Sequence, residues 1–192
     1  MVIALVGEAP NDTDSIANLL SRKYDSGFDF IPLLNRTNGS DLDSQKTKRL
    51  LRNEYEFEKR KGNAIDVVIF VRDLDGLASN SHQRTIRDDY FTNFNSVVDR
   101  KGIYLLNIYE IEALILADIK TFNAKYNTTV EQVEDSMLIE EPKEFLRGQK
   151  VGYFESHNPE IFGLLDFETV YSNCNYFSLF IDRFNRLIKD LR

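Results

Sequence analysis

The sequence predicts an α/β fold: a mostly parallel four-stranded sheet with helices on both faces and a helical C-terminal extension. Short apolar runs alternate with segments of helical periodicity through the first 120 residues. These runs end at glycine or turn-forming residues, as strands that feed crossover helices do. The alternation stops near Thr121, and further helical segments follow. We therefore expect an α/β core over residues 1–120 and a helical extension over residues 121–192 packed on the core.

Four apolar runs are expected to form the strands. The third run is apolar at consecutive positions, which is typical of a strand buried on both faces. The second contains Pro32, which lacks an amide donor and therefore favours the edge or the start of a strand. The expected strands cover residues 2–6, 28–34, 65–71 and 103–108.

Helices are expected between these strands and after them. Asn11 to Asp14 offer N-cap residues for the first helix, in which Ile16 and Leu20 recur at helical spacing. The basic side chains of the second helix are either a contact surface for phosphates or a solvated face. Residues 35–40 are rich in turn-forming types and predict a loop. After the first, the expected helices cover residues 41–61, 84–98, 108–118, 130–137, 142–146 and 177–191.

Composition limits the classes of function. A formal net charge of −7 argues against broad, non-specific binding of nucleic acid. The one cysteine, Cys174, cannot form an intramolecular disulfide and lies in an apolar stretch, so we expect a buried thiol. The first residues lack the basic flank and the long apolar run of a signal peptide, and no segment reaches transmembrane length. We expect a cytoplasmic protein that does not associate with membranes.

Two aspartates follow the third predicted strand. The apolar run over residues 67–71, in the strand predicted over residues 65–71, leads to Asp73, Asp75 and Gly76. If the strand geometry persists, the two carboxylates point to the same side of the sheet. Open α/β sheets bind their ligands at the carboxyl ends of strands. The two aspartates are therefore candidates for a binding site, and the alternative is a charged turn whose acids are solvated.

Further acids follow the first and the fourth strands. Glu8 comes after the first strand, so three carboxylates converge if strands one and three are neighbours. Like charges at such a distance need a cation, and oxygen ligands suit Mg²⁺ or Mn²⁺, which predicts phosphoester chemistry. Glu112 lies in an apolar segment and requires a partner, which is a metal, a base or a backbone cap. The roles of Glu110 and Asp118, the other acids of this segment, stay open.

The order of these acids resembles the TOPRIM family. The family pattern is a Glu after the first strand and Asp-x-Asp after the third, which falls on Glu8 and on Asp73-Leu74-Asp75. More specifically, the chain is similar to small stand-alone bacterial TOPRIM-like proteins of the phage-defence, overcoming-lysogenization-defect type. In these a further acidic motif precedes a helix after the fourth strand, as Glu110-x-Glu112 does here. The resemblance covers roughly the first 120 residues.

The resemblance implies a Mg²⁺-dependent (or Mn²⁺-dependent) nuclease or phosphodiesterase. Asp73 and Asp75 would bind the metal, and Glu8 would act as general base or as a further ligand. Glu112 would serve a second metal or the outer shell. The substrate would be nucleic acid or a nucleotide phosphate, and an ATPase is a candidate partner, because small TOPRIM-like proteins are often encoded beside one. The family usually has glycine after its first Glu where this chain has Ala9, so the backbone turn there differs.

Two other functions remain open. The segment from Asp73 to Gly76 also resembles the first motif of haloacid-dehalogenase-like phosphatases, in which Asp73 would be the nucleophile. In that family the motif usually follows the first strand, whereas here it follows the third. The other function is that of a non-catalytic regulatory or adaptor subunit whose acidic site is vestigial. The acidic charge and the helical segment over residues 121–192 fit docking to a partner.

Overall fold

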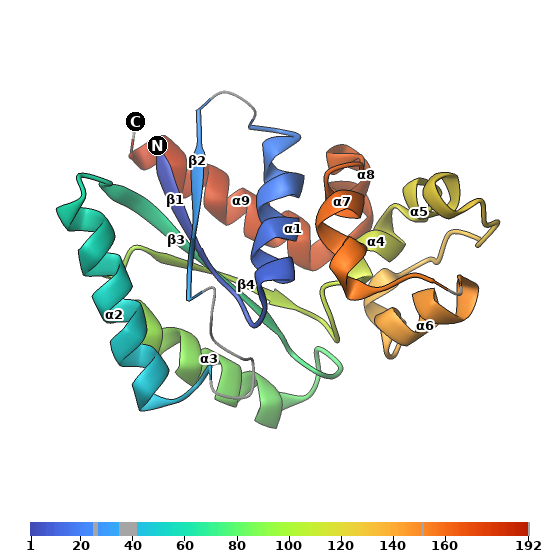
Figure 1. Ribbon diagram of the computed structural model, residues 1–192. Coiled ribbons are helices and arrows are strands. Elements are labelled where there is room, and N and C mark those ends of the chain that lie inside the picture. The colour runs from blue at the N-terminus through green and yellow to red at the C-terminus, as the bar shows by residue number, and fades with distance from the viewer. Residues whose placement is uncertain (25–26, 35–41, 151, 192) are drawn as a thin grey trace.

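Four parallel strands form the sheet, in the order β2-β1-β3-β4 (Figure 1). The computed structural model describes residues 1–24, 27–34, 42–150 and 152–191. The predicted parallel sheet is confirmed, and Pro32 lies in an edge strand as expected. The strands are β1 (Val2–Val6), β2 (Asp29–Leu33), β3 (Ile65–Asp73) and β4 (Gly102–Asn107).

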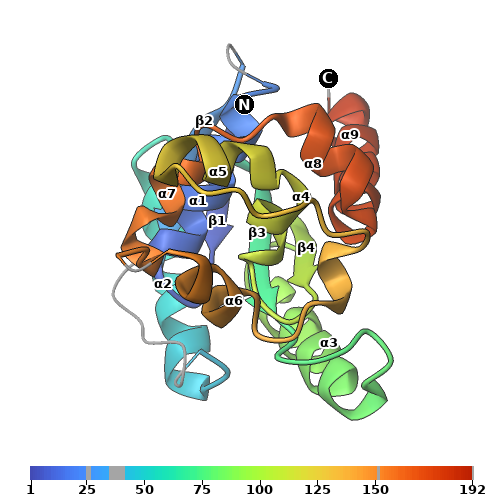
Figure 2. The same ribbon diagram turned by 90° about the vertical axis from the view of Figure 1, so that its right-hand side faces the viewer.

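Helices cover both faces of the sheet, because the side chains of β3 alternate between two apolar cores. Val67, Ile69 and Val71 belong to the core that α1 and α9 complete. Val68 and Phe70 belong to the core beneath α2 and α3. Figures 1 and 2 show the sheet between these two pairs of helices. The four helices are α1 (Pro10–Ser21), α2 (Gln45–Arg60), α3 (Ser81–Asn95) and α9 (Asn175–Asp190).

The chain between β4 and α9 forms short helices to one side of the sheet (Figure 2). Among them α7 packs against α1, where Asn18 Nδ2 donates a hydrogen bond to the Pro159 carbonyl at 2.8 Å. The core beneath α1 and α9 continues into these helices, so residues 121–192 share an apolar core with the sheet. The elements are α4 (Ala113–Ala117), α5 (Ile119–Tyr126), η2 (Ser136–Leu138), α6 (Pro142–Gln149), η3 (Glu155–His157), α7 (Asn158–Phe162) and α8 (Phe167–Asn173). A boundary at residue 120 stays a prediction.

Two of the predicted helices differ from the structure. The helix expected over residues 108–118 is reduced to α4, because Tyr109 adopts a left-handed φ of 55° and Asp118 an extended φ of −126°. The prediction over residues 130–137 is wrong, since the 3₁₀ turn η2 forms at its end, where Asp135 accepts a hydrogen bond from Met137 N at 2.8 Å. Helices α5, α7 and α8 are too short to give a readable period.

The remaining expectations agree with the structure within a few residues. Helix α2 begins at Gln45 because Ser44 caps it by accepting a hydrogen bond from Thr47 N at 3.1 Å. The loop expected over residues 35–40 lies outside the described residues. Cys174 is buried, as predicted. None of the helices in the described part of the chain is long and apolar enough to cross a membrane.

Candidate functional site

Acidic side chains gather where β1 and β3 end. These strands are paired with Val6 opposite Phe70, so Glu8 and Asp73 follow neighbouring strands. The amide nitrogen of Asp73 lies 3.4 Å from Glu8 Oε1, which is the long limit of a hydrogen bond. The condition that strands one and three are neighbours is therefore met, and Glu8 lies beside Asp73.

Asp12, which the sequence reasoning treated only as a helix cap, reaches the same place from the first turn of α1. Gly7 permits this close approach, because a Cβ there would lie 2.9 Å from Thr13 Cγ2. Asp12 Oδ2 accepts a hydrogen bond from Ala9 N at 3.0 Å and so caps the helix. Burial nevertheless raises the pKa of Asp12 to about 7, and repulsion from nearby carboxylates adds to the rise.

Asp73 is the residue on which these acids converge. Its Oδ1 accepts a hydrogen bond at 3.0 Å from Nδ2 of Asn107, the residue opposite it on β4. Burial raises the pKa of Asp73 well above its ordinary value, and repulsion from Asp12, Glu8 and Glu112 raises it further. The carboxylates of Glu8, Asp12 and Glu112 therefore lie close enough to Asp73 for their charges to oppose its ionisation.

Glu112 approaches from the start of α4 and is 3% exposed. Its Oε1 accepts a hydrogen bond from Asn158 Nδ2 at 2.9 Å, and Asn158 Oδ1 accepts one from the Tyr153 hydroxyl at 2.7 Å. Burial raises the pKa of Glu112 even though the amide of Asn158 favours the charged form. The sequence required a partner for Glu112, and the structure supplies a neutral amide from α7.

Asp75 lies beyond the end of β3 and pairs with α3. Strand β3 ends at Asp73, and Asp75 has a left-handed φ of 55°. Its exposed carboxylate forms an ion pair with Arg87 Nη2. The expectation that strand geometry would carry both aspartates to one side is not met, because the strand stops between them. A role for Asp75 as a metal ligand stays a prediction that this geometry does not favour.

Two arginines that the sequence reasoning missed contact the acidic residues. Arg72 is 3% exposed, and its Nε lies 2.7 Å from Glu8 Oε1. This contact is an ion pair rather than a hydrogen bond, because the N–H direction does not meet hydrogen-bond geometry. Arg72 Nη1 donates to Asp43 Oδ1 at 2.6 Å, and Arg87 Nε donates to the Asp73 carbonyl at 2.9 Å. A charged residue between the apolar run of β3 and Asp73 was the available signal for Arg72.

The two other acids near α4, Glu110 and Asp118, accept hydrogen bonds from the segments that follow α4. Glu110 Oε2 accepts a hydrogen bond from Lys143 N at 3.0 Å. Asp118 Oδ2 accepts hydrogen bonds from Asp166 N at 2.9 Å and from the Thr121 hydroxyl at 2.7 Å. Both carboxylates therefore join α4 to the helices that follow it.

The four converging acids have the donor chemistry of a hard divalent cation. Glu8, Asp12, Asp73 and Glu112 offer oxygen ligands, which suit Mg²⁺ or Mn²⁺. The raised pKa values of three of them indicate negative charge that their surroundings do not compensate. In their present positions, however, no three acidic, histidine or cysteine side chains of the described residues are arranged to hold a metal ion. A bound cation would require the carboxylates to move closer together.

Comparison of the chain with protein-family models, with curated proteins and with solved structures finds no match. The resemblance to the TOPRIM family therefore depends on the acidic residues and on their places at the strand ends.

Proposed function

We propose that the chain is a Mg²⁺-dependent or Mn²⁺-dependent phosphodiesterase of TOPRIM-like type, acting on nucleic acid or nucleotide phosphates. The observation that carries this proposal is the convergence of Glu8, Asp12, Asp73 and Glu112 at the carboxyl ends of neighbouring strands. Such a concentration of partly and fully buried carboxyl groups costs stability and is characteristic of functional sites. A cation bound between them would offset that cost.

Each acid has a support that fixes its position. Asn107 holds the carboxylate of Asp73, and Asn158 holds that of Glu112. Arg72 pairs with Glu8, whose side chain keeps about a quarter of its surface accessible (26%). In the proposed reaction, Glu8 is the acid that a substrate can reach, and it accepts a proton from the attacking water. A bound metal ion would lower the pKa of that water and stabilise charge on the phosphate.

Calorimetric titration with Mg²⁺ and Mn²⁺ tests the proposed metal site. The variants Asp73→Asn and Asp12→Asn should lose binding by at least tenfold, because each removes a charged oxygen ligand. The matched control is Asp75→Asn, which should bind like the parent because Asp75 follows the end of β3 in a left-handed turn and is paired with Arg87. Circular dichroism establishes that the variants fold. Parent-like binding by both Asp73→Asn and Asp12→Asn contradicts the proposal.

Hydrolysis is tested separately from binding. A Glu8→Gln variant should keep the metal and lose phosphodiester cleavage, followed with single-stranded DNA, RNA and a bis-nitrophenyl phosphate ester. Cleavage at the parent rate by Glu8→Gln contradicts the role given to Glu8. If the parent binds metal and cleaves none of these substrates, the proposed activity is wrong.

A second candidate function is that of a non-catalytic regulatory or adaptor subunit with a vestigial site. It is favoured by the pairing of Glu8 with Arg72 and of Asp75 with Arg87, which occupies two of the acids in the family pattern. An ATPase remains the proposed partner protein in either case. Absence of Mg²⁺ binding by the parent would favour this second function. The phosphatase alternative stays less favoured because Asp73 follows the third strand, β3, whereas the first motif of that family usually follows the first strand.

A further inference from the structure

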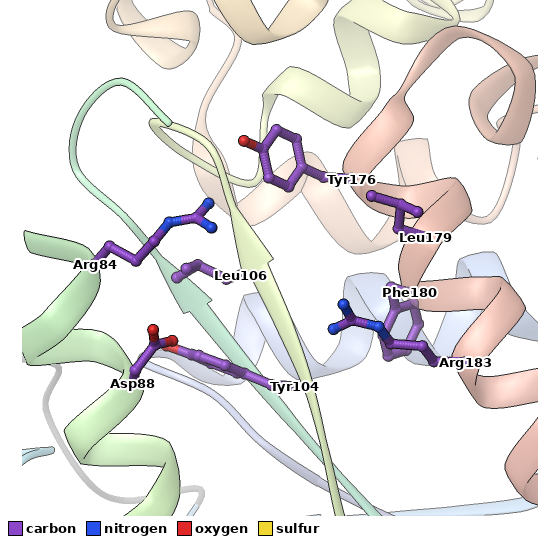
Figure 3. A pocket seen from close by; sticks show the side chains of 8 residues that line it. All are labelled: Arg84, Asp88, Tyr104, Leu106, Tyr176, Leu179, Phe180 and Arg183. Atoms are coloured by element: carbon purple, nitrogen blue, oxygen red, sulfur yellow. The ribbon is translucent and has the colours of Figure 1, made fainter. Parts of the chain in front are cut away.

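A small pocket lies beside the edge strand β4, between α3 and α9 (Figure 3). Its volume is about 170 Å³. At about 30 Å³ per water molecule this is the space of roughly five or six waters. Typical sites for whole small molecules have roughly 300–1,000 Å³. The pocket therefore suits one compact group of a ligand, with the rest of the ligand outside.

Two arginines from different helices point into this pocket. Figure 3 shows the guanidinium groups of Arg84, on α3, and Arg183, on α9, directed toward the space between the helices. Neither side chain forms an ion pair or a hydrogen bond with any residue that the structure describes. The Arg84 Nε atom and the Tyr104 hydroxyl at the pocket wall are also buried with no hydrogen-bond partner in the described part of the chain. Buried donors without partners are costly, so this arrangement is typical of a site that a ligand completes.

The walls of the pocket are aromatic and hold the polar groups in place. The Tyr104 ring stacks on Phe91 with the ring centres 4.9 Å apart and the planes parallel to within 1°. The Tyr176 hydroxyl lies on the same side of the pocket as the Arg84 guanidinium, and Phe180 lines the pocket together with Arg183 on α9 (Figure 3). One acid, Asp88, also lines the pocket, beside Tyr104 and away from Arg183. The pocket thus carries two positive charges and one negative charge.

We propose that this pocket is an oxyanion site, in which Arg84 and Arg183 together bind a phosphate group. A guanidinium offers planar, paired donors that match phosphate oxygens, and two of them from opposite walls can hold one phosphate from both sides. The Tyr176 and Tyr104 hydroxyls are further donors at the rim and the wall. The phosphate comes either from solution or from a nucleic-acid strand. This inference does not depend on the metal site. Helix α3 nevertheless connects the pocket with the acidic residues, because Arg87 follows Arg84 by one helical turn and contacts the Asp73 carbonyl.

The test uses the full chain in EDTA at constant ionic strength, so that metal binding plays no part. Inorganic phosphate is titrated in one arm and an unlabelled twelve-residue single-stranded DNA in the other. Binding is followed by calorimetry and by the Nε–Hε resonances of the arginines in NMR spectra. We expect the Arg84 and Arg183 resonances to shift on titration. Each of the variants Arg84→Gln and Arg183→Gln should weaken binding roughly ten- to a hundredfold, the loss of a charge-assisted contact.

Two further variants should not weaken phosphate binding. Arg186→Gln is the matched control, because Arg186 lies one turn along α9 from Arg183 and its Nε donates to the Asp182 carbonyl. It should bind like the parent. Asp88→Asn removes the repelling charge and should tighten binding several-fold. Circular dichroism establishes that every variant is folded.

The outcomes distinguish free phosphate from a nucleic-acid phosphate as the ligand, and they include the results that overturn the proposal. Binding of inorganic phosphate that both arginine variants lose supports the site with free phosphate as ligand. Binding of DNA alone, lost in both variants, supports it with a nucleic-acid phosphate as ligand. The proposal is overturned if neither probe binds, or if Arg84→Gln and Arg183→Gln bind like Arg186→Gln. In EDTA the acidic site holds no metal, so an Asp73→Asn variant should bind phosphate like the parent. Failure of the phosphate pocket can therefore be distinguished from failure of the proposed hydrolysis.

Discussion

Replacing Asp12 by asparagine should stabilise the metal-free protein at alkaline pH. Asparagine keeps an oxygen that accepts the Ala9 N–H, so the cap of α1 survives while the charge is removed. Burial shifts the pKa of Asp12 from its usual 3.8 to about 7. At about 1.4 kcal/mol per pH unit, this shift corresponds to about 4 kcal/mol. Asp12 keeps some contact with solvent, and screening reduces the expected gain to about 2 kcal/mol.

The sign of this effect depends on pH. The pKa of Asp12 is higher in the folded than in the unfolded protein, so its protonation stabilises the fold fully below about pH 4. That stabilisation is lost as the pH rises through about 7. The neutral variant should therefore match the parent near pH 4 and exceed it at pH 8. Loss of the favourable interaction between the charge and the start of α1 opposes the gain by about 0.5–1 kcal/mol, which is smaller.

Thermal unfolding in EDTA, followed by circular dichroism between pH 4 and pH 8.5, measures the effect. For a chain of this length a gain of about 2 kcal/mol raises the midpoint by about 4–8 °C. The exposed Asp14 lies on the same helix, so Asp14→Asn is the matched control and should change the midpoint little. The reasoning is refuted if Asp12→Asn is less stable than the parent at pH 8, or if its gain is the same at every pH.

Three further predictions follow from the contacts of the acidic site. Substituting Asn158→Leu leaves Glu112 and the Tyr153 hydroxyl without their partner. Urea unfolding should then show a free energy of unfolding lower by about 2–4 kcal/mol. A loss below about 0.5 kcal/mol contradicts the hydrogen bonds described. Substituting Arg72→Met leaves Glu8 unpaired and should cost about 2 kcal/mol in the same assay, and a neutral result would mean that the ion pair contributes nothing. Mg²⁺ should bind more tightly as the pH rises from about 6 to 8, by up to about tenfold per unit, because a proton leaves Asp12, whose pKa is about 7, on binding. Calorimetry in two buffers of different ionisation enthalpy measures the released protons, and an affinity independent of pH argues against Asp12 as a ligand.

The strands could be predicted because their signal is local. Each strand is a short apolar run that ends at a turn, and the third run is apolar on both faces because β3 is central. The pairing of β1 with β3, on which the site depends, is a long-range property that no local pattern contains. Sequence reasoning could state it only as a condition, which the structure meets. Short helices such as α7 were missed because five residues do not complete two turns.

The acidic site could be predicted in part. Glu8, Asp73 and Glu112 were identified because acids directly after a strand or inside an apolar segment are unusual. Asp12 was missed because an aspartate in a first helical turn is ordinarily a cap, and only the folded structure shows that it also lies partly buried beside other acids. Asp75 was expected beside Asp73 because the left-handed turn that redirects it has no sequence signature apart from Gly76 nearby.

A crystal structure of the protein soaked in Mn²⁺, with the metal located by anomalous scattering, is the sharpest test of the proposed metal site. We expect a peak with oxygens of Asp73 and of at least one of Asp12, Glu8 and Glu112 at roughly 2.0–2.6 Å, the range for Mg²⁺-like to Ca²⁺-like ligation. Asp75 should remain paired with Arg87 in that structure. A peak held instead by Asp75, or no peak near Asp73 at saturating Mn²⁺, contradicts the account.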